Sequence, residues 1–241
     1  MQILKDTPCT ESSPDASALL RVGSYNIRHG GDVALDMSVI ARDVTDLSLD
    51  IIGFQEIDQM TARVGGLDTM AALSVASGYK YYAFAKAINY KGGEYGTAIL
   101  SRYPIVDFEV IALESGNEEH RSVGHAVIDV GGTHLDFFNT HLSYESLDMR
   151  TLQYKQLAGL LAKCETYILT GDFNTERLSE FDVLPSATLV NPRKFPTFTS
   201  SGKAIDNIVI SKNYSIVSSG TGPEGHSDHV LLWAQLEFER R

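Results

Sequence analysis

The stretch Tyr167-Ile168-Leu169-Thr170-Gly171-Asp172-Phe173-Asn174 carries the pattern that decides how this 241-residue chain folds. Its first four residues are apolar or β-branched, which is typical of a buried strand. A glycine, a carboxylate and an amide follow at or near the point where that strand should end. Polar side chains at the ends of strands are held by a rigid scaffold, so this pattern predicts both a sheet and a functional site at its rim.

Similar runs recur along the whole chain. We predict strands at 20–27, 51–54, 81–84, 97–100, 106–113, 125–130, 135–139, 167–170, 205–210 and 230–238. Helical spacing of apolar residues is found in three places only: after Asp36, which can cap a helix; between Leu67 and Leu73; and at 145–163. Many strands with few helices, and hairpin-length gaps between 81 and 140, favour two mixed, mostly antiparallel sheets packed face to face and flanked by helices.

Composition and length predict one soluble globular domain. Hydrophobic residues make up 43% of the chain and charged residues 21%, and no Pro/Gly-rich linker divides it. We expect a single domain at 18–241, large enough for an enzyme, after a flexible N-terminal extension at 1–17. No run is long and apolar enough for a transmembrane segment, and the extension lacks the apolar core of a signal peptide. We expect a monomer, with a cytoplasmic location and export after signal removal both left open.

The formal net charge of −11 limits the partners that the protein can bind. Nucleic-acid binding depends on Lys and Arg side chains that neutralise phosphates, so this charge disfavours a general nuclease. The two cysteines, Cys9 and Cys164, are too few for a disulfide framework or a cysteine-based zinc site. We expect Cys164 to be a small buried apolar residue at the end of the third helix.

Chemically active side chains gather near the predicted strand ends. The set is Asn26, Glu56, His141, Asp172, Asn174, Asp206, Asp228 and His229. Carboxylates and amides are hard oxygen ligands that suit Mg²⁺, Mn²⁺ or Ca²⁺ better than zinc. The chain has no phosphate-binding P-loop and no Gly-x-Ser-x-Gly nucleophile motif. Hydrolysis by an activated water, with no covalent intermediate, is therefore the simplest chemistry for this set.

Six short motifs, in order, resemble the signature blocks of the endonuclease/exonuclease/phosphatase superfamily. They are Ser-Tyr-Asn-Ile-Arg at 24–28, Gln-Glu at 55–56, Asn-Thr-His at 139–141, Gly-Asp-Phe-Asn at 171–174, Ile-Asp at 205–206 and Ser-Asp-His at 227–229. That group includes pancreatic-type deoxyribonucleases, apurinic endonucleases, sphingomyelinases and inositol-phosphate phosphatases. The resemblance implies a four-layer α/β sandwich. The segment at 56–68 is similar to a bacterial subgroup described as metal-dependent hydrolases.

The resemblance also implies roles for these residues. It implies that Glu56 and Asn26 bind Mg²⁺ or Mn²⁺, with Asp228 as a further ligand or a support for one. Asp172 would orient or deprotonate the attacking water. Asn174 would contact the metal or the phosphate.

Two histidines have implied roles as well. Asp206 would hold one ring nitrogen of His229 and so fix its tautomer and raise its basicity. His141 would donate to a phosphate oxygen or protonate the leaving group.

Three arginines are candidate substrate ligands. Many nucleases of the family carry Asp where Arg28 stands, and a guanidinium can grip a phosphate but cannot bind a metal. Alternation along the predicted strand would place Arg28 on the same face as Asn26. Arg63 and Arg121 are either substrate clamps or ordinary solvated charges. A second departure is Asn207, where many members have Tyr.

Three hypotheses of function follow from the sequence. The first is a metal-dependent phosphodiesterase or phosphatase for a small molecule or a phospholipid headgroup, which the acidic charge and Arg28 favour. The second is a nuclease for DNA or RNA, which the family resemblance alone supports. The third, a non-catalytic binding module, is disfavoured because Glu56, Asp172 and His229 are all present.

Overall fold

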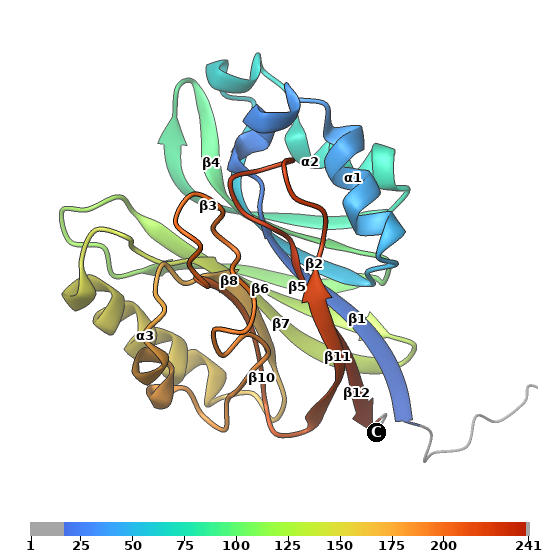
Figure 1. Cartoon of the computed structure of the whole chain (residues 1–241), viewed down its shortest axis with the longest axis vertical. Coiled ribbons are helices and arrows are strands. Elements are labelled where there is room, and N and C mark those ends of the chain that lie inside the picture. Colours follow the sequence, from blue (N-terminus) through green and yellow to red (C-terminus); the bar gives the residue numbers. More distant parts are fainter. Residues whose placement is uncertain (1–16, 240–241) are drawn as a thin grey trace, which may run out of the picture.

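The computed structural model describes residues 17–239, and two six-stranded sheets pack face to face in it (Figure 1). The order of strands is β11-β12-β1-β2-β4-β3 in one sheet and β5-β6-β7-β8-β10-β9 in the other. Helices α1 and α2 lie outside the first sheet and α3 lies outside the second. This is a four-layer α/β sandwich, as the motifs implied. The expected extension at 1–17 lies outside the described residues, except that β1 begins at Ser17.

The elements have the following bounds. The strands are β1 Ser17–Asn26, β2 Ile51–Gln59, β3 Tyr81–Tyr90, β4 Gly93–Ser101, β5 Ile105–Leu113, β6 Arg121–Val130, β7 Thr133–His141, β8 Ile168–Asp172, β9 Thr188–Leu189, β10 Asp206–Ile210, β11 Tyr214–Thr221 and β12 Leu232–Glu239. The helices are α1 Met37–Asp46, α2 Thr69–Ser77 and α3 Leu147–Leu161, with short 3₁₀ turns η1 Arg28–Val33, η2 Ala62–Val64 and η3 Leu178–Val183. No helix in the described range is long and apolar enough to cross a membrane.

Each helix begins where the sequence places a capping side chain. Asp36 accepts a hydrogen bond from the backbone N–H of Ser38, and Asp68 accepts one from that of Ala71. Ser146 does the same for Met149 at the start of α3. These caps satisfy N–H groups that have no partner within the helix, so the three helix starts are encoded locally. The first helix therefore begins as predicted, and the third is shorter than predicted by two residues at each end.

Strand order brings the polar strand ends together. Strands β1 and β2 pair in parallel, and so do β7 and β8, while the other neighbours are antiparallel. The carboxyl ends of β1, β2, β7 and β8 therefore meet the amino ends of β10 and β12 at one rim of the sandwich. Within the sheet of β7, β8 and β10, Asp172 is directly opposite His141 on one side and Asp206 on the other.

The two sheets approach very closely at Gly53 of β2. A Cβ atom there would lie 2.1 Å from Thr170 Oγ1 and 2.4 Å from Asn139 Oδ1. Asn139 crosses the space between the sheets: its Nδ2 donates to the carbonyls of Phe54 (2.8 Å) and Ala98 (2.9 Å), and its Oδ1 accepts from Gln55 (2.7 Å). This fully buried network fixes one sheet against the other beneath the rim, because buried polar groups are costly unless they are paired.

Two strands were not predicted from the sequence. Strand β11 lies at the edge of its sheet, and most of its residues are exposed, with Ile216 and Val217 adjacent among Ser, Gly and Thr, so it lacks the apolar alternation used to find strands. Strand β9 has only two residues. The apolar core between the sheets and the cores beneath the helices otherwise contain the runs that the sequence indicated. Cys164 follows α3 and is only partly buried, less than we expected.

Candidate active site

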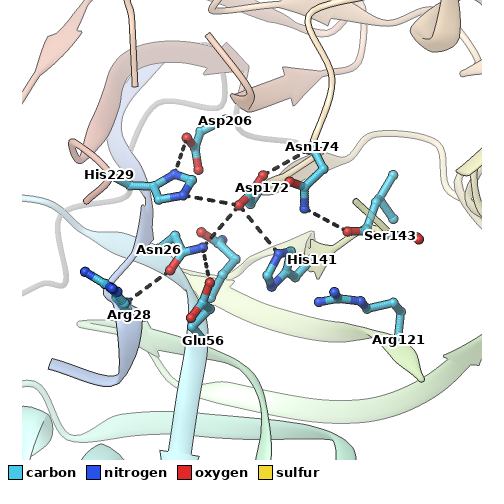
Figure 2. A network of polar contacts seen from close by, with 12 residues as sticks. Asn26, Arg28, Glu56, Arg121, His141, Ser143, Asp172, Asn174, Asp206 and His229 are labelled. Carbon is cyan, nitrogen blue, oxygen red and sulfur yellow. Dashed lines mark hydrogen bonds and ion pairs between the residues drawn. The ribbon is translucent and has the colours of Figure 1, made fainter. Parts of the chain in front are cut away.

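The polar side chains at the rim form one connected network (Figure 2). Its centre is Asp172, which is 2% exposed and lies at the end of β8. One carboxylate oxygen, Oδ2, accepts from Asn26 Nδ2 at 3.1 Å and lies 3.5 Å from His141 Nε2 and 3.6 Å from His229 Nε2. The other, Oδ1, accepts from the backbone N–H of Asn174 at 2.9 Å. Residues from the ends of β1 and β7 and from two loops thus converge on a single carboxylate at the end of β8.

Burial and repulsion alter the acidity of this carboxylate. Removal from water, together with the neighbouring charge of Asp206, raises the pKa of Asp172 to about 7. The donors Asn26 and Asn174 and the charge of His229 oppose this rise by stabilising the ionised form. A carboxylate with a pKa near neutrality is suited to accept a proton from water at physiological pH.

Asp206 and His229 form a buried pair. His229 Nδ1 lies 2.8 Å from Asp206 Oδ2, and both side chains are at most 5% exposed. Burial by itself would lower the pKa of His229, but the carboxylates of Asp206 and Asp172 raise it to about 10. With Nδ1 bound to Asp206, Nε2 faces Asp172 (Figure 2).

His141 is electrostatically the opposite of His229. Burial, and the positive charges of Arg121 and His229, hold the pKa of His141 well below its usual range. Two histidines on either side of one carboxylate therefore carry different charges at neutral pH. A neutral His141 can donate one hydrogen bond but has no proton to release as a strong acid, which favours the first of its two implied roles.

The position of Glu56 depends on a β-bulge in β2. The register against β4 shifts between Phe54 and Ile57, and Glu56 has a φ of +57°. Such a bulge bends a strand and re-aims its side chains, and it is common beside active sites. Glu56 Oε1 accepts from Asn26 Nδ2 at 3.0 Å. Burial and the charge of Asp228 raise the pKa of Glu56, so the carboxylate is held where a compensating positive charge would stabilise it.

These residues fit a hard divalent cation. Oε2 of Glu56 has no hydrogen-bond partner in the described part of the chain, and Asp206 Oδ1 is a buried oxygen without one. Asn26 Nδ2 donates to both Glu56 and Asp172 and therefore lies between two carboxylates, which is a position where a cation would also be stabilised. Asp172, Asp206 and His229 also lie close enough together to share an ion. Asp228 is more peripheral, with its side chain 31% exposed and paired with Arg28.

One expectation about Arg28 is wrong. Strand β1 ends at Asn26, and Arg28 belongs to the turn η1 with a φ of +45°. Asn26 Oδ1 accepts from the backbone N–H of Arg28 at 3.0 Å, and an Asn side chain that binds the backbone two residues on is a typical cause of a turn. Alternation along a strand therefore does not orient Arg28. Its half-exposed side chain lies 3.3 Å from Asp32 and 3.6 Å from Asp228, at the edge of the site.

The other two arginines differ from each other. Arg121 begins β6, is 4% exposed, and lies beside His141 in Figure 2. Its Nη2 is 3.1 Å from Glu119, while its buried Nε has no hydrogen-bond partner. Arg63 is not brought into the network: it donates twice to buried Asp58, at 2.9 Å and 2.6 Å, and lies over the Tyr90 ring at 4.7 Å.

The structure adds two supporting residues, Ser227 and Phe198, to the candidate site residues. Ser227 Oγ donates to the Asn26 carbonyl at 2.8 Å and accepts from the His229 N–H at 3.3 Å, so it connects β1 to the loop that carries His229. Phe198 packs against the His229 ring, with 4.9 Å between centroids. Ser227 was part of the Ser-Asp-His motif, whereas Phe198 had no signal in the sequence because only the folded loop brings it near.

Comparisons with known proteins agree with the fold and with the motifs. The sequence profile of the Endonuclease/Exonuclease/phosphatase family matches residues 23–229. This chain therefore belongs to that family, whose members are phosphoric ester hydrolases that typically depend on a divalent cation. A search of curated proteins found no match.

Solved structures with the same fold share little sequence with this chain. The endonuclease/exonuclease/phosphatase from Beutenbergia cavernae DSM 12333 has a TM-score of 0.76 at 20% identity, over 91% of this chain and 72% of that one. The mannosyl-6-phosphatase Bt3783 of Bacteroides thetaiotaomicron VPI-5482 has a TM-score of 0.69 at 19% identity, over 90% and 99%. The human Nocturnin catalytic domain, with bound sulfate, has a TM-score of 0.71 at 18% identity, over 93% and 97%.

Proposed function

We propose that this protein hydrolyses a small phosphate ester, or the phosphate of a phospholipid headgroup, by direct attack of water and with Mg²⁺ or Mn²⁺ as cofactor. The observation that carries the proposal is the buried network around Asp172, in which residues from all six motifs come together at one rim. The ion would be held by Glu56 and Asn26, with Asp228 nearby, and would polarise a phosphoryl oxygen and offset charge in the transition state.

Asp172 acts on the attacking water, and Asn174 holds Asp172 in place. Asp172 orients the water and accepts its proton, because this carboxylate is buried among donors and its pKa of about 7 allows it to be ionised near neutral pH. Asn174 holds Asp172 through its backbone N–H, and its Nδ2 donates to the Leu142 carbonyl at 2.9 Å. This fixes the carboxylate against the phosphate site and costs no reorganisation during the reaction.

The remaining side chains act on the phosphate. His229, kept protonated by Asp206, presents Nε2–H to a phosphoryl oxygen, and neutral His141 donates a second hydrogen bond. Arg121 contributes positive charge from beneath His141, and its unpartnered Nε adds a donor to the same region. Arg28 stands at the rim, where it can exchange Asp228 for a substrate anion.

The acidic charge supports a small substrate over a polymer. With 31 acidic and 20 basic residues, the chain has a surface that repels a polyanion at long range. A small ester needs only the local positive charges of the site. Nuclease activity on DNA or RNA is the second candidate, and the family alone supports it.

A substrate panel tests this proposal. Phosphomonoesters, phosphodiesters, sphingomyelin-type lipids and nucleic acids would be assayed with Mg²⁺ and with Mn²⁺, for the natural sequence and for Asp172→Asn. We expect hydrolysis of a small ester or lipid that is lost in the variant. Preferential cleavage of nucleic acid would replace the proposal with its alternative, and activity that survives Asp172→Asn would reject the assigned base.

A further inference from the structure

A hollow opens directly beside the catalytic network. Its volume is about 380 Å³, and its walls include Tyr144, Asn174, Arg177, Phe198 and Lys203. Two of these residues also belong to the site: Asn174 binds Asp172 through its backbone N–H, and Phe198 packs on the His229 ring. A substrate whose phosphate lies between Asp172 and His229 therefore has room for its organic part on this side.

The hollow carries unbalanced positive charge. Within residues 17–239, the side chains of Arg177 and Lys203 are exposed and make no hydrogen bond or ion pair. A third cation of the wall, Arg150, is held by Glu180 at 3.0 Å and by the Ser143 carbonyl at 3.1 Å. The acid of the wall, Glu176, accepts from the backbone N–H of Ala204 at 3.0 Å.

This local charge is opposite in sign to that of the whole protein, which is −11. Free cations in a concave site attract an anion more strongly than the same cations on an open surface, because low-dielectric walls focus the field. The rim on the Arg28 side differs, since Asp32 and Asp228 already surround that guanidinium. The hollow with Arg177 and Lys203 therefore favours an anionic group more strongly than the Arg28 side of the site does.

Aromatic side chains give the hollow flat walls. Tyr144, which is 65% exposed, and Phe198, which packs on the His229 ring, both line the hollow. Aromatic faces of this kind pack against planar or pyranose rings. An anionic group at the far side of such a ring would lie near Arg177 and Lys203.

We propose that the hollow binds the organic part of the substrate, and that the substrate class is a ring-bearing phosphate ester with a second anionic group, a carboxylate or another phosphate. This inference rests on the proposed function of the adjoining site. Arg177 and Lys203 are then the residues that select for the second anion, while the network around Asp172 performs the hydrolysis.

A matched pair of aryl phosphates tests the selection. 4-Carboxyphenyl phosphate and 4-carbamoylphenyl phosphate have nearly the same shape and differ in the second negative charge. We expect the natural protein to prefer the carboxylate in kcat/KM, and the ratio between the two esters to fall about fivefold in Arg177→Ala or Lys203→Ala, as for a partly exposed ion pair. Because the ratio is compared between proteins, intrinsic differences between the leaving groups cancel.

Control variants separate local from general effects. Lys212 lines a different hollow, with Tyr214 and Phe238, so Lys212→Ala should leave the ratio unchanged. Arg177→Glu should reverse the preference. An equal ratio in the natural protein, Arg177→Ala and Arg177→Glu would overturn the inference while leaving the proposed function intact.

A binding measurement keeps the two proposals distinguishable. If the protein is folded by circular dichroism but hydrolyses neither these two esters nor any small ester or lipid of the substrate panel with Mg²⁺ or Mn²⁺, the proposed function fails. Calorimetric titration with 4-carboxyphenylphosphonate and with phenylphosphonate then decides about the hollow. Tighter binding of the carboxylate that is lost in Arg177→Ala supports the second-anion site, and equal binding rejects it.

Discussion

Replacement of Asp206 by Asn should move both limbs of the pH–activity profile to lower pH. In the natural protein we expect activity to rise as Asp172 ionises through about 7 and to fall as His229 loses its proton through about 10. Asp206 raises both pKa values, because its charge stabilises the His229 imidazolium at 2.8 Å and opposes the ionisation of Asp172. The substitution Asp206→Asn removes this charge and nearly preserves the shape of the side chain.

The size of the effect follows from the environment of His229. The interval from the ordinary pKa of 6.5 to about 10 corresponds to roughly 5 kcal/mol in favour of the charged ring. Asp206 is the nearer of the two carboxylates, at 2.8 Å against 3.6 Å for Asp172, and burial still opposes charge in the variant. We therefore expect the pKa of His229 to fall towards its ordinary value of 6.5, at which only about one ring in 30 keeps its proton at pH 8. On this basis kcat/KM at pH 8 should fall by up to roughly 30-fold.

The sign of the stability effect is also fixed. A raised histidine pKa stabilises the fold fully below the unfolded value of 6.5, and this contribution is lost as the pH rises through about 10. The difference in unfolding free energy between the natural protein and Asp206→Asn should therefore shrink as the pH rises from neutral towards 10. Carbon–proton NMR of the imidazole, in metal-free protein, gives the titration of His229 directly.

Three results would refute this reasoning. One is an unchanged His229 titration in Asp206→Asn, and another is a basic limb that stays in place. The third concerns coupling: His229→Ala, Asp206→Ala and the double variant should show losses that are far from additive, because the pair acts as a unit. Fully additive losses would reject the pairing.

Four further outcomes are expected. Glu56→Gln should raise the concentration of Mg²⁺ or Mn²⁺ needed for half-maximal activity and lower turnover, and full activity of the natural protein after EDTA treatment would contradict a metal requirement. Arg28→Ala should raise KM for the true substrate and leave metal affinity, measured by calorimetry, nearly unchanged. Gly53→Ala should destabilise the protein by about 2 kcal/mol or more in urea unfolding, since its methyl group would overlap Thr170 and Asn139; an unchanged midpoint would mean that the sheets can separate there. Duplex DNA should bind weakly at ~150 mM salt in an anisotropy titration, and tight binding with a steep salt slope would restore the nuclease hypothesis.

Much of the site was predictable because strands encode it locally. An apolar run that ends in Asp172, or in Asn26, shows both the strand and the functional side chain in a few consecutive residues. The helix caps Asp36 and Asp68 are local signals of the same kind, and so they also appear in the sequence. The order of the six strand-end motifs along the chain was enough to indicate the family, and the match of the family's sequence profile to residues 23–229 confirms it.

Other features depend on which strands become neighbours. Alternation along an extended chain gave the wrong placement for Arg28, because the Asn26 side chain captures its N–H and turns the chain out of the strand. The spacing of residues along the sequence does not reveal that Arg63 is held by Asp58, or that Arg121 is buried beside the site. The bulge that aims Glu56 is likewise visible only as a shift in register against β4.

The sequence by itself determined most of the secondary structure, the chemical types of the site residues and the overall negative charge, because each of these depends on composition or on neighbours within a few positions. Only the tertiary structure decided the charge states and the shape of the site. Asp172, His141 and His229 acquire different acidities because burial and charges from other strands act on them across distances of a few ångströms. The hollow with Arg177 and Lys203 exists for the same reason, since loops distant in sequence enclose it together.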